Sequence, residues 1–258
     1  MDKNIVIVGI GELGSVFARG FLRMGLTVSP VVRGADMADV AENNPNPELV
    51  LMAVAEKDID QTLMDLPNRW KDKTGLLQNE LLPEQWEKYS IKNPTVISVW
   101  FEKKKGMDTK ILLPSVIYGP QSILLAEALK SLNIPTRILD SAQELLVELV
   151  VKNVFVYTIN IAGLMVGGTT GQLWEKHQQF ATDIAAEIVK LQAKITSTSL
   201  SEIEMIDRFS QSLNSDPDHR CMGRAAQQRL KRTIQLAGEY KLELPHIKSI
   251  NEKILSAL

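Results

Sequence analysis

The stretch "VIVGIGELG", residues 6–14, decides the fold of this 258-residue chain. Gly9, Gly11 and Gly14 follow an apolar run and precede a helical pattern, which is the G-x-G-x-x-G spacing of a dinucleotide-binding turn. In such a turn the first glycine permits the tight bend, the second lets the backbone approach a pyrophosphate, and the third allows close helix–strand packing. Bound phosphates then face the positive end of the helix dipole. The sequence therefore predicts a strand–turn–helix unit that holds a dinucleotide.

The end of the second predicted strand indicates which dinucleotide binds. An acidic residue at this place accepts hydrogen bonds from the ribose 2′-OH of NAD, whereas an arginine suits the 2′-phosphate of NADP. The strand reads "TVSPVVRG" (27–34), with no carboxylate at its end and Arg33 in the expected place. Arg33 on a solvated loop is the alternative interpretation. The pattern favours NADP(H) as the cofactor.

The first half of the chain alternates short apolar runs with helical patterns. Fully apolar strands separated by amphipathic helices are typical of a parallel sheet that is covered on both faces. The connection 33–48 is short and polar, and it has little room for the extra strand and helix that many such domains carry. The predicted strands are 4–9, 27–32, 49–54, 74–78, 95–100 and 136–139.

From about Asp140 the strand-like runs stop and long helical patterns follow. Ser141 is a good N-cap, with Glu144 at the capping-box spacing. We therefore predict an α/β Rossmann domain with a mostly parallel doubly wound sheet (1–139), followed by an all-α domain for substrate binding and dimerisation (140–258). The predicted helices are 141–166, 171–197, 200–212, 217–238 and 245–257.

The composition excludes several classes of function. The formal net charge is −2, so nothing draws the chain to nucleic acid or to an anionic membrane surface. One cysteine, Cys221, excludes an internal disulfide and fits a reducing, cytoplasmic compartment. The three histidines lack metal-ligand spacing, so no metal site is expected. The apolar region 144–168 is interrupted by charged and amide side chains and is a poor membrane span, whereas an apolar helical domain is compatible with a homodimer.

The run "VVKNVFVYTIN", residues 150–160, places Lys152 inside an apolar helix. Removing an ammonium from water costs several kcal/mol unless a partner or ligand compensates. A local pair with Glu148, one turn earlier, is one explanation; a site that faces a cleft is the other. Asn160 lies roughly 12 Å further along the helix and about 80° around it, whereas Asn153 points away from Lys152 and is better explained as structural.

Taken together, these motifs resemble the ketopantoate reductase family, NADPH-dependent enzymes that reduce a 2-oxo acid to a 2-hydroxy acid. The resemblance covers nearly the whole chain. Besides the glycine turn and Arg33, it rests on "LLQNELL" (76–82), "VVKNVFVYTIN" (150–160), "MGRAAQQ" (222–228) and "GEYKLELPHI" (238–247).

The resemblance implies a role for each matching residue. Lys152 matches the general acid that donates a proton to the ketone oxygen, and Asn79 and Asn160 match residues that position the substrate. Arg224 and Gln227 fall in the segment that meets substrate, although a solvated basic helix face would explain Arg224 equally well. The implied cofactor-binding residues are Gly9, Ile10, Gly11, Glu12, Leu13, Gly14, Arg33, Ala53, Val54 and Asn79.

Several positions depart from the family pattern. Val156 replaces the first asparagine of the Lys-x₃-Asn-x₃-Asn helix, Gln227 or a neighbour replaces a glutamate, and Ala55 replaces a lysine. Glu80 stands where the family has glycine. These changes fall on substrate recognition more than on the cofactor, and they argue against ketopantoate itself as the substrate.

The expected function is thus an NADPH-dependent reductase acting on a small anionic carbonyl or imine compound, with its active site between the two domains. One alternative is a non-catalytic NADPH-binding protein of the same fold, used for sensing or for partner binding. The other is a related hydroxyacid dehydrogenase or imine reductase.

Overall fold

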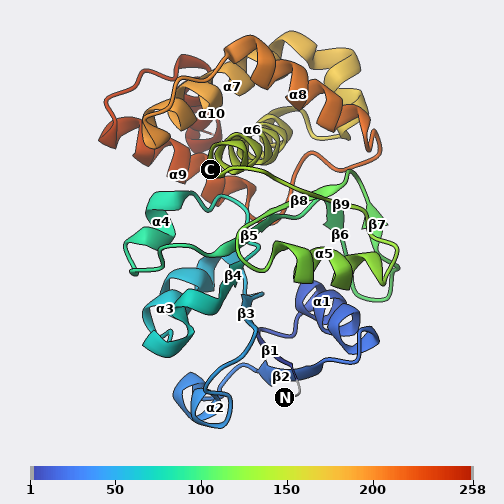
Figure 1. The fold of residues 1–258 in the computed structure, drawn as a ribbon. Coiled ribbons are helices and arrows are strands. Elements are labelled where there is room, and N and C mark those ends of the chain that lie inside the picture. The colour runs from blue at the N-terminus through green and yellow to red at the C-terminus, as the bar shows by residue number, and fades with distance from the viewer. Residues whose placement is uncertain (1–2, 257–258) are drawn as a thin grey trace. The chain divides into compact units, whose positions relative to one another are not determined.

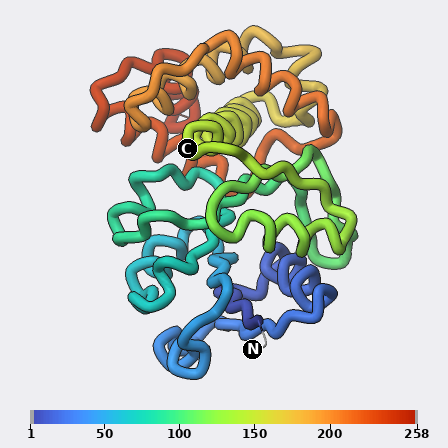
Figure 2. The backbone as a smooth tube through the Cα atoms, in the orientation of Figure 1, coloured from blue at the N-terminus to red at the C-terminus, as the bar shows by residue number. Residues whose placement is uncertain are grey.

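A computed structural model of the chain describes residues 3–256 (Figures 1 and 2). Within these residues the backbone forms two compact units, one up to Leu149 and one from Val150 onward. The sequence placed this division at residue 139/140, where the secondary structure changes from strand to helix. The boundary between the compact units lies ten residues later, inside the first helix of the helical part, where Arg137 Nη2 donates to Glu148 Oε1 at 2.6 Å.

The first unit contains a seven-stranded sheet, counted over the described residues, with the order β2-β1-β3-β4-β5-β8-β9. The elements in chain order are β1 (Asn4–Val8), α1 (Glu12–Arg23), β2 (Thr27–Val31), α2 (Met37–Asn43), β3 (Leu49–Met52), η1 (Glu56–Asp58), α3 (Ile59–Met64), η2 (Asn68–Lys73), β4 (Thr74–Leu76), α4 (Pro83–Glu87), β5 (Thr95–Ser98), β6 (Phe101–Glu102), β7 (Lys110–Ile111), β8 (Ser115–Tyr118), α5 (Ser122–Lys130) and β9 (Thr136–Ile138).

The sheet is buried on both faces, as its continuous apolar strands predict. Ile5 and Ile7 of β1 belong to one core cluster with Phe17 of α1 and Leu125 of α5. Val6, which points to the opposite face, is also fully buried. Helices on both sides of the sheet therefore remove its apolar strands from water, which is the main favourable term in folding.

The predicted parallel sheet is confirmed, with one strand that the sequence reading missed. Strand β8 pairs antiparallel with β5, through the register Ile97↔Ile117, and parallel with β9. The short connection before β3 contains the seven-residue α2 and no strand, so β2 lies at the edge of the sheet. An edge position explains how β2 tolerates Pro30, which has no N–H to donate to a neighbouring strand.

From Ala142 onward the described chain is helical, and four of the five predicted helices match closely. Ser141 Oγ accepts from Glu144 N at 3.1 Å, which confirms the predicted N-cap. The predicted helix 217–238 is wrong at its start, because residues 217–225 form an irregular segment. The helices are α6 (Ala142–Val166), α7 (Thr170–Thr196), α8 (Glu202–Asn214), α9 (Ala226–Glu239) and α10 (Pro245–Ser256).

Helix α6 is long and apolar enough to span a membrane by length and composition, with a mean hydropathy of 1.7 over an 18-residue window. However, 78% of that window is buried inside the structure. This burial is what a core helix shows, and it explains the apolar composition without a membrane.

Candidate functional site

The glycine turn joins β1 to α1, and its backbone requires glycine at two places. Gly9 has φ +93°, and a Cβ there would lie 2.8 Å from the carbonyl oxygen of Ala53. A Cβ on Gly14 would lie 2.1 Å from the carbonyl oxygen of Gly9, so this residue lets α1 pack directly against the turn. Strand, turn and helix therefore adopt the predicted arrangement, with the third glycine at the closest approach.

Gly11 lies at the open side of the same turn. Over the described residues, a Cβ on Gly11 would meet no atom within 4 Å. Gly11 is also the N-cap of α1, and it has no side chain that could occupy the amide groups of the first helical turn. Ile10 and Glu12 are exposed beside it, and Leu13 is half-buried. The turn thus has the free space and the oriented N–H groups that a pyrophosphate requires.

The predicted cofactor residues from β2 and β3 follow the carboxyl ends of their strands. Arg33 is exposed in a turn closed by Ala35 N to Val32 O at 3.0 Å. Ala53 N donates to Val8 O at 2.7 Å, which brings the end of β3 against the glycine turn. Val54 is half-buried, and one of its methyl groups would be 3.2 Å from a Cβ on Gly9.

Asn79 follows β4 and is held by a polar network. Its Nδ2 donates to Glu56 Oε1 at 3.1 Å. The buried neighbour Gln78, which the sequence reading did not single out, donates from Nε2 to Met52 O at 2.7 Å and thereby ties the end of β4 to the end of β3. The sequence signal that could have identified Gln78 is its position directly before Asn79 in "LLQNELL". Glu80, which stands where the family that the sequence resembles has glycine, adopts the left-handed φ of 64°.

In the helical unit, Lys152 lies on α6 among buried apolar residues and is itself half-buried. Its Nζ is 5.6 Å from the centroid of the Phe155 ring, a cation–π distance. Phe155 in turn contacts His219, with ring centroids 6.1 Å apart. Glu148 lies one turn before Lys152, and the sequence offers it as a local partner for this lysine. Its Oε1 accepts a hydrogen bond from Arg137 Nη2 at 2.6 Å.

Asn160 contacts the irregular segment that precedes α9. Its Oδ1 accepts from Gly223 N at 2.9 Å, and its Nδ2 donates to Val156 O at 2.7 Å. The structure therefore brings Asn160 next to the loop that carries Arg224. Arg224 and Gln227 are both exposed, Arg224 just before α9 and Gln227 in its first turn.

Two other residues have structural explanations. Asn153 is buried and donates from Nδ2 to Gln192 Oε1 of α7 at 2.9 Å. Cys221 is fully buried, and its burial raises the pKa of the thiol to about 11. A thiol with this pKa is protonated at neutral pH, which argues against a nucleophilic role.

Two of the three histidines have carboxylate neighbours that the sequence spacing did not indicate. His246 Nδ1 lies 2.9 Å from Glu187 Oε1, and its Nε2 lies 3.6 Å from Asp183 Oδ2. His219 Nδ1 lies 3.8 Å from Asp216 Oδ2. The His246 contacts join α7 to the start of α10, so the partners are far apart in the sequence.

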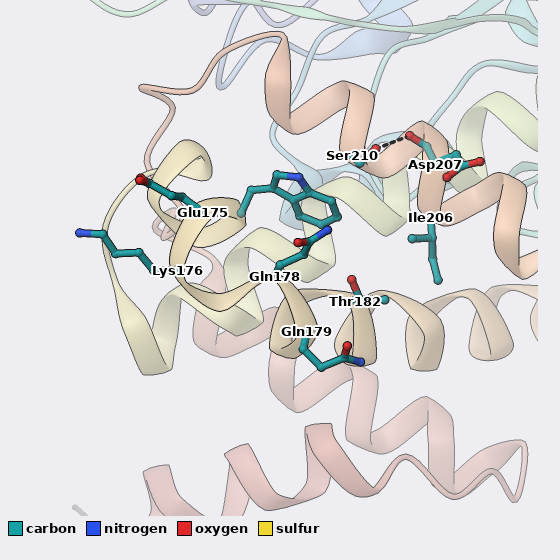
Figure 3. Close-up of a pocket in the computed structure, with 9 residues that line it drawn as sticks. Glu175, Lys176, Gln178, Gln179, Thr182, Ile206, Asp207 and Ser210 are labelled. Atoms are coloured by element: carbon teal, nitrogen blue, oxygen red, sulfur yellow. Dashed lines mark hydrogen bonds between the residues drawn. The ribbon is translucent and has the colours of Figure 1, made fainter.

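A separate cavity of about 640 Å³ lies between α7 and α8 (Figure 3). In Figure 3, Gln178 and Thr182 line it from α7 and Asp207 and Ser210 from α8. Over the part of the chain that the structure describes, its lining includes none of the predicted site residues. It is an open, largely polar depression rather than the predicted site.

Comparisons with known proteins bear on the fold. No protein-family model matches the sequence, and no curated protein matches it. A solved 2-dehydropantoate 2-reductase from Methylococcus capsulatus aligns with 98% of this chain and 97% of its own, with a TM-score of 0.72 and 15% identity.

Two further solved structures align over a similar length. A D-mandelate dehydrogenase with NADH and anilino(oxo)acetate covers 98% of this chain and 97% of its own, with a TM-score of 0.69 and 14% identity. A dimeric ketopantoate reductase from Staphylococcus aureus covers 98% of each chain, with a TM-score of 0.62 and 16% identity. The resemblance predicted from the glycine turn and the lysine helix is thus found in the backbone as well: this chain has the fold of the ketopantoate reductases.

Proposed function

We propose that this chain is an NADPH-dependent reductase of a small 2-oxo acid or a related carbonyl compound. The observation that supports it best is the glycine turn, where Gly9 and Gly14 are required by close contacts and Gly11 leaves open space. A turn of this geometry at a helix N-terminus suits a pyrophosphate. The fold it shares with reductases and with a dehydrogenase that was solved with NADH supports the same class of cofactor.

The residues that would hold the cofactor surround the carboxyl ends of β1 to β4. Ile10, Gly11, Glu12 and Leu13 would present backbone amides to the pyrophosphate, and Arg33 would pair with the 2′-phosphate. The ends of β3 and β4 would contribute Ala53, Val54 and Asn79. When bound, a reduced nicotinamide supplies the hydride that the reaction needs.

We assign the proton donor to Lys152. Reduction of a ketone adds hydride to carbon, and the oxygen must gain a proton to become a hydroxyl. An ammonium suits this role because it stabilises the negative charge that develops on that oxygen and then delivers the proton. Asn79 and Asn160 would orient the substrate, and Arg224 and Gln227 would meet its anionic end. Anilino(oxo)acetate, bound in the D-mandelate dehydrogenase, also carries a carboxylate next to a carbonyl.

The test measures NADPH and NADH oxidation with a panel of 2-oxo acids. The Lys152→Ala variant should lose turnover by about 10²-fold or more, the size expected for a general acid, while NADPH affinity stays near that of the wild type. Lys190→Ala, which removes an exposed lysine from α7, is the matched control. Unchanged turnover in Lys152→Ala would exclude Lys152 from the mechanism.

A second candidate is a non-catalytic NADPH-binding protein of the same fold. The contacts of Asn160 favour it, because its amide bonds to Gly223 N and Val156 O and so has a structural use. Tight NADPH binding without oxidation across a broad panel of oxo acids and imines would support this candidate. Oxidation of a 2-hydroxy acid whose oxo acid lies outside the accepted substrates of the reductase would instead indicate a related hydroxyacid dehydrogenase, and reduction of an imine but of no oxo acid would indicate an imine reductase.

We further propose that the chain forms a homodimer. The expectation came from the apolar helical domain, and one solved structure of this fold is described as dimeric. Sedimentation equilibrium at micromolar concentration distinguishes a dimer from a monomer of 28.8 kDa.

A further inference from the structure

The short hairpin formed by β6 and β7 is packed onto α1, the helix that follows the glycine turn. Phe101 of β6 is buried in the same cluster as Phe17 of α1, and their ring centroids are 6.1 Å apart. Aromatic pairs at this spacing hold their elements in a defined orientation. The hairpin loop, residues 103–109, therefore begins close to the N-terminal half of α1.

Lys103, the first residue of this loop, has its ammonium held in place. Its Nζ donates to the carbonyl oxygen of Lys104 at 3.2 Å and to that of Met107. The side chain is only 20% exposed, which is low for a lysine, and Nζ lies 4.0 Å from Glu12 Oε2. A lysine that forms hydrogen bonds within its own loop has lost side-chain freedom before any ligand binds.

Glu12 makes this arrangement more than a surface ion pair. It is the first residue of α1 and directly follows Gly11, the open glycine of the turn. A carboxylate here stabilises the free helix end, but it repels a pyrophosphate that binds to the same amides. A cation close by would offset this repulsion when a dinucleotide binds at the turn, and the ammonium of Lys103 is the one that lies against Glu12.

We propose that Lys103 is a further cofactor-binding residue, whose ammonium pairs with the pyrophosphate of the dinucleotide in place of Glu12. The proposal rests on the part of the proposed function that binds a dinucleotide at the glycine turn. It does not depend on whether the protein reduces an oxo acid. It assigns different phosphates to different cations: Lys103, beside α1, to the pyrophosphate, and Arg33, after β2, to the 2′-phosphate.

This assignment is tested by the dissociation constants of NADPH and NADH, measured by fluorescence on the full-length protein. Lys103→Met should weaken both dinucleotides by the same factor, about tenfold, the loss typical of one charge-assisted hydrogen bond. Arg33→Met should weaken NADPH alone. Lys104→Met is the matched control, because that lysine is 62% exposed and pairs with Glu102 at 3.0 Å; it should change neither affinity.

Glu12→Gln separates direct contact from neutralisation of Glu12. Removing this carboxylate should tighten the binding of both dinucleotides, and Lys103→Met should still weaken binding in the Glu12→Gln background. If Lys103→Met has no effect in that background, Lys103 serves only to neutralise Glu12 and the proposed contact is wrong. Circular dichroism and thermal unfolding of each variant establish that it is folded.

The outcomes distinguish this inference from the proposed function. Wild-type affinity in a folded Lys103→Met variant overturns the inference, whether or not the protein reduces oxo acids. A tenfold loss of affinity in a protein that turns over no substrate supports the inference and overturns the reductase. If the wild type binds neither dinucleotide, both are overturned.

Discussion

At the scale of single residues, the glycines of one turn are required for different reasons. Gly14 is required by packing, because a Cβ would collide with the backbone of Gly9. Gly11 meets no such contact within residues 3–256, and its φ of −79° is allowed for any residue. Packing therefore does not require a glycine at position 11, although glycine is a favourable N-cap residue. The proposed dinucleotide would add a second reason, because its pyrophosphate would approach this backbone.

Alanine substitutions at Gly11 and Gly14 should separate folding from binding. Gly14→Ala should lower the free energy of unfolding by about 2 kcal/mol or more, since backbone must move to admit the methyl group. Gly11→Ala should change it by less than about 0.5 kcal/mol yet weaken NADPH binding. Urea denaturation and NADPH titration measure the two effects, and unaltered NADPH binding in Gly11→Ala would contradict a phosphate site at the turn.

Glu80 offers a second prediction at this scale. A non-glycine residue with a left-handed φ of 64° carries a steric cost of about 1 kcal/mol that glycine avoids. Glu80→Gly should therefore be more stable than Glu80→Ala by about that amount. Both variants lack the Glu80 carboxylate, so the difference between their free energies of unfolding in urea does not include the loss of that group. Equal stability would show that the surrounding loop relaxes.

Cys221 leads to a prediction about pH. Its thiol pKa is raised from 9.0 to about 11 by burial, so the unfolded chain loses this proton first as pH rises. The stabilising contribution is complete below about pH 9 and is lost as pH approaches 11. Between pH 8.5 and 10.5, urea denaturation should show a fall in the free energy of unfolding of the wild type. The Cys221→Ala variant should lack this fall. The same fall in both proteins would mean that other groups cause it.

At the scale of elements, buried polar side chains hold neighbouring helices together. Glu187 of α7 is 4% exposed and accepts from His246 N at 2.8 Å and from Ile247 N at 3.0 Å, the first free amides after Pro245. Glu187 thus caps the N-terminus of α10 from another helix. Its negative charge also lies at the positive end of the α10 helix dipole.

The Glu187→Gln variant tests this cap. Replacing a charged acceptor of two helix amides should lower the free energy of unfolding by about 2 kcal/mol. Glu175→Gln, on the exposed part of the same helix, should change it by less than about 0.5 kcal/mol. Thermal or urea denaturation measures both variants. A Glu187→Gln variant as stable as the control would show that water or another hydrogen-bond acceptor replaces the cap.

At the scale of the whole molecule, the predicted dinucleotide contacts all belong to the first compact unit. A ligand that binds only the folded state adds RT ln(1 + [L]/Kd) to the free energy of unfolding. NADPH at one hundred times its Kd should therefore stabilise the protein by about 2.7 kcal/mol. Urea denaturation with and without NADPH measures the shift, which should be smaller in Gly11→Ala at the same NADPH concentration because that variant binds NADPH more weakly. If unfolding has two steps, only the step of the first unit should shift.

Much of the fold was predictable because its signals are local. Strand β1 and the turn after it follow from residues 4–14 alone, and the Ser141 cap needs only the four residues that form it. Strand β8 was missed because "SVIY" is four residues long and its pairing partner β5 lies some twenty residues earlier. Residues 217–225 were predicted to be helical, but Gly223 N bonds to Asn160 and Cys221 N to Gly168 O, and these contacts replace helical hydrogen bonds.

The sequence by itself determined the strand–glycine–helix unit, the change from α/β to all-α structure and the candidate residues, because spacing and periodicity act over a few turns of chain. Only the tertiary structure decided which of those residues have structural partners. It placed Gly223 against Asn160, Glu187 at the start of α10 and Lys103 beside Glu12. Each of these contacts joins residues about 60 or more positions apart, where free energy depends on packing and burial rather than on local preference.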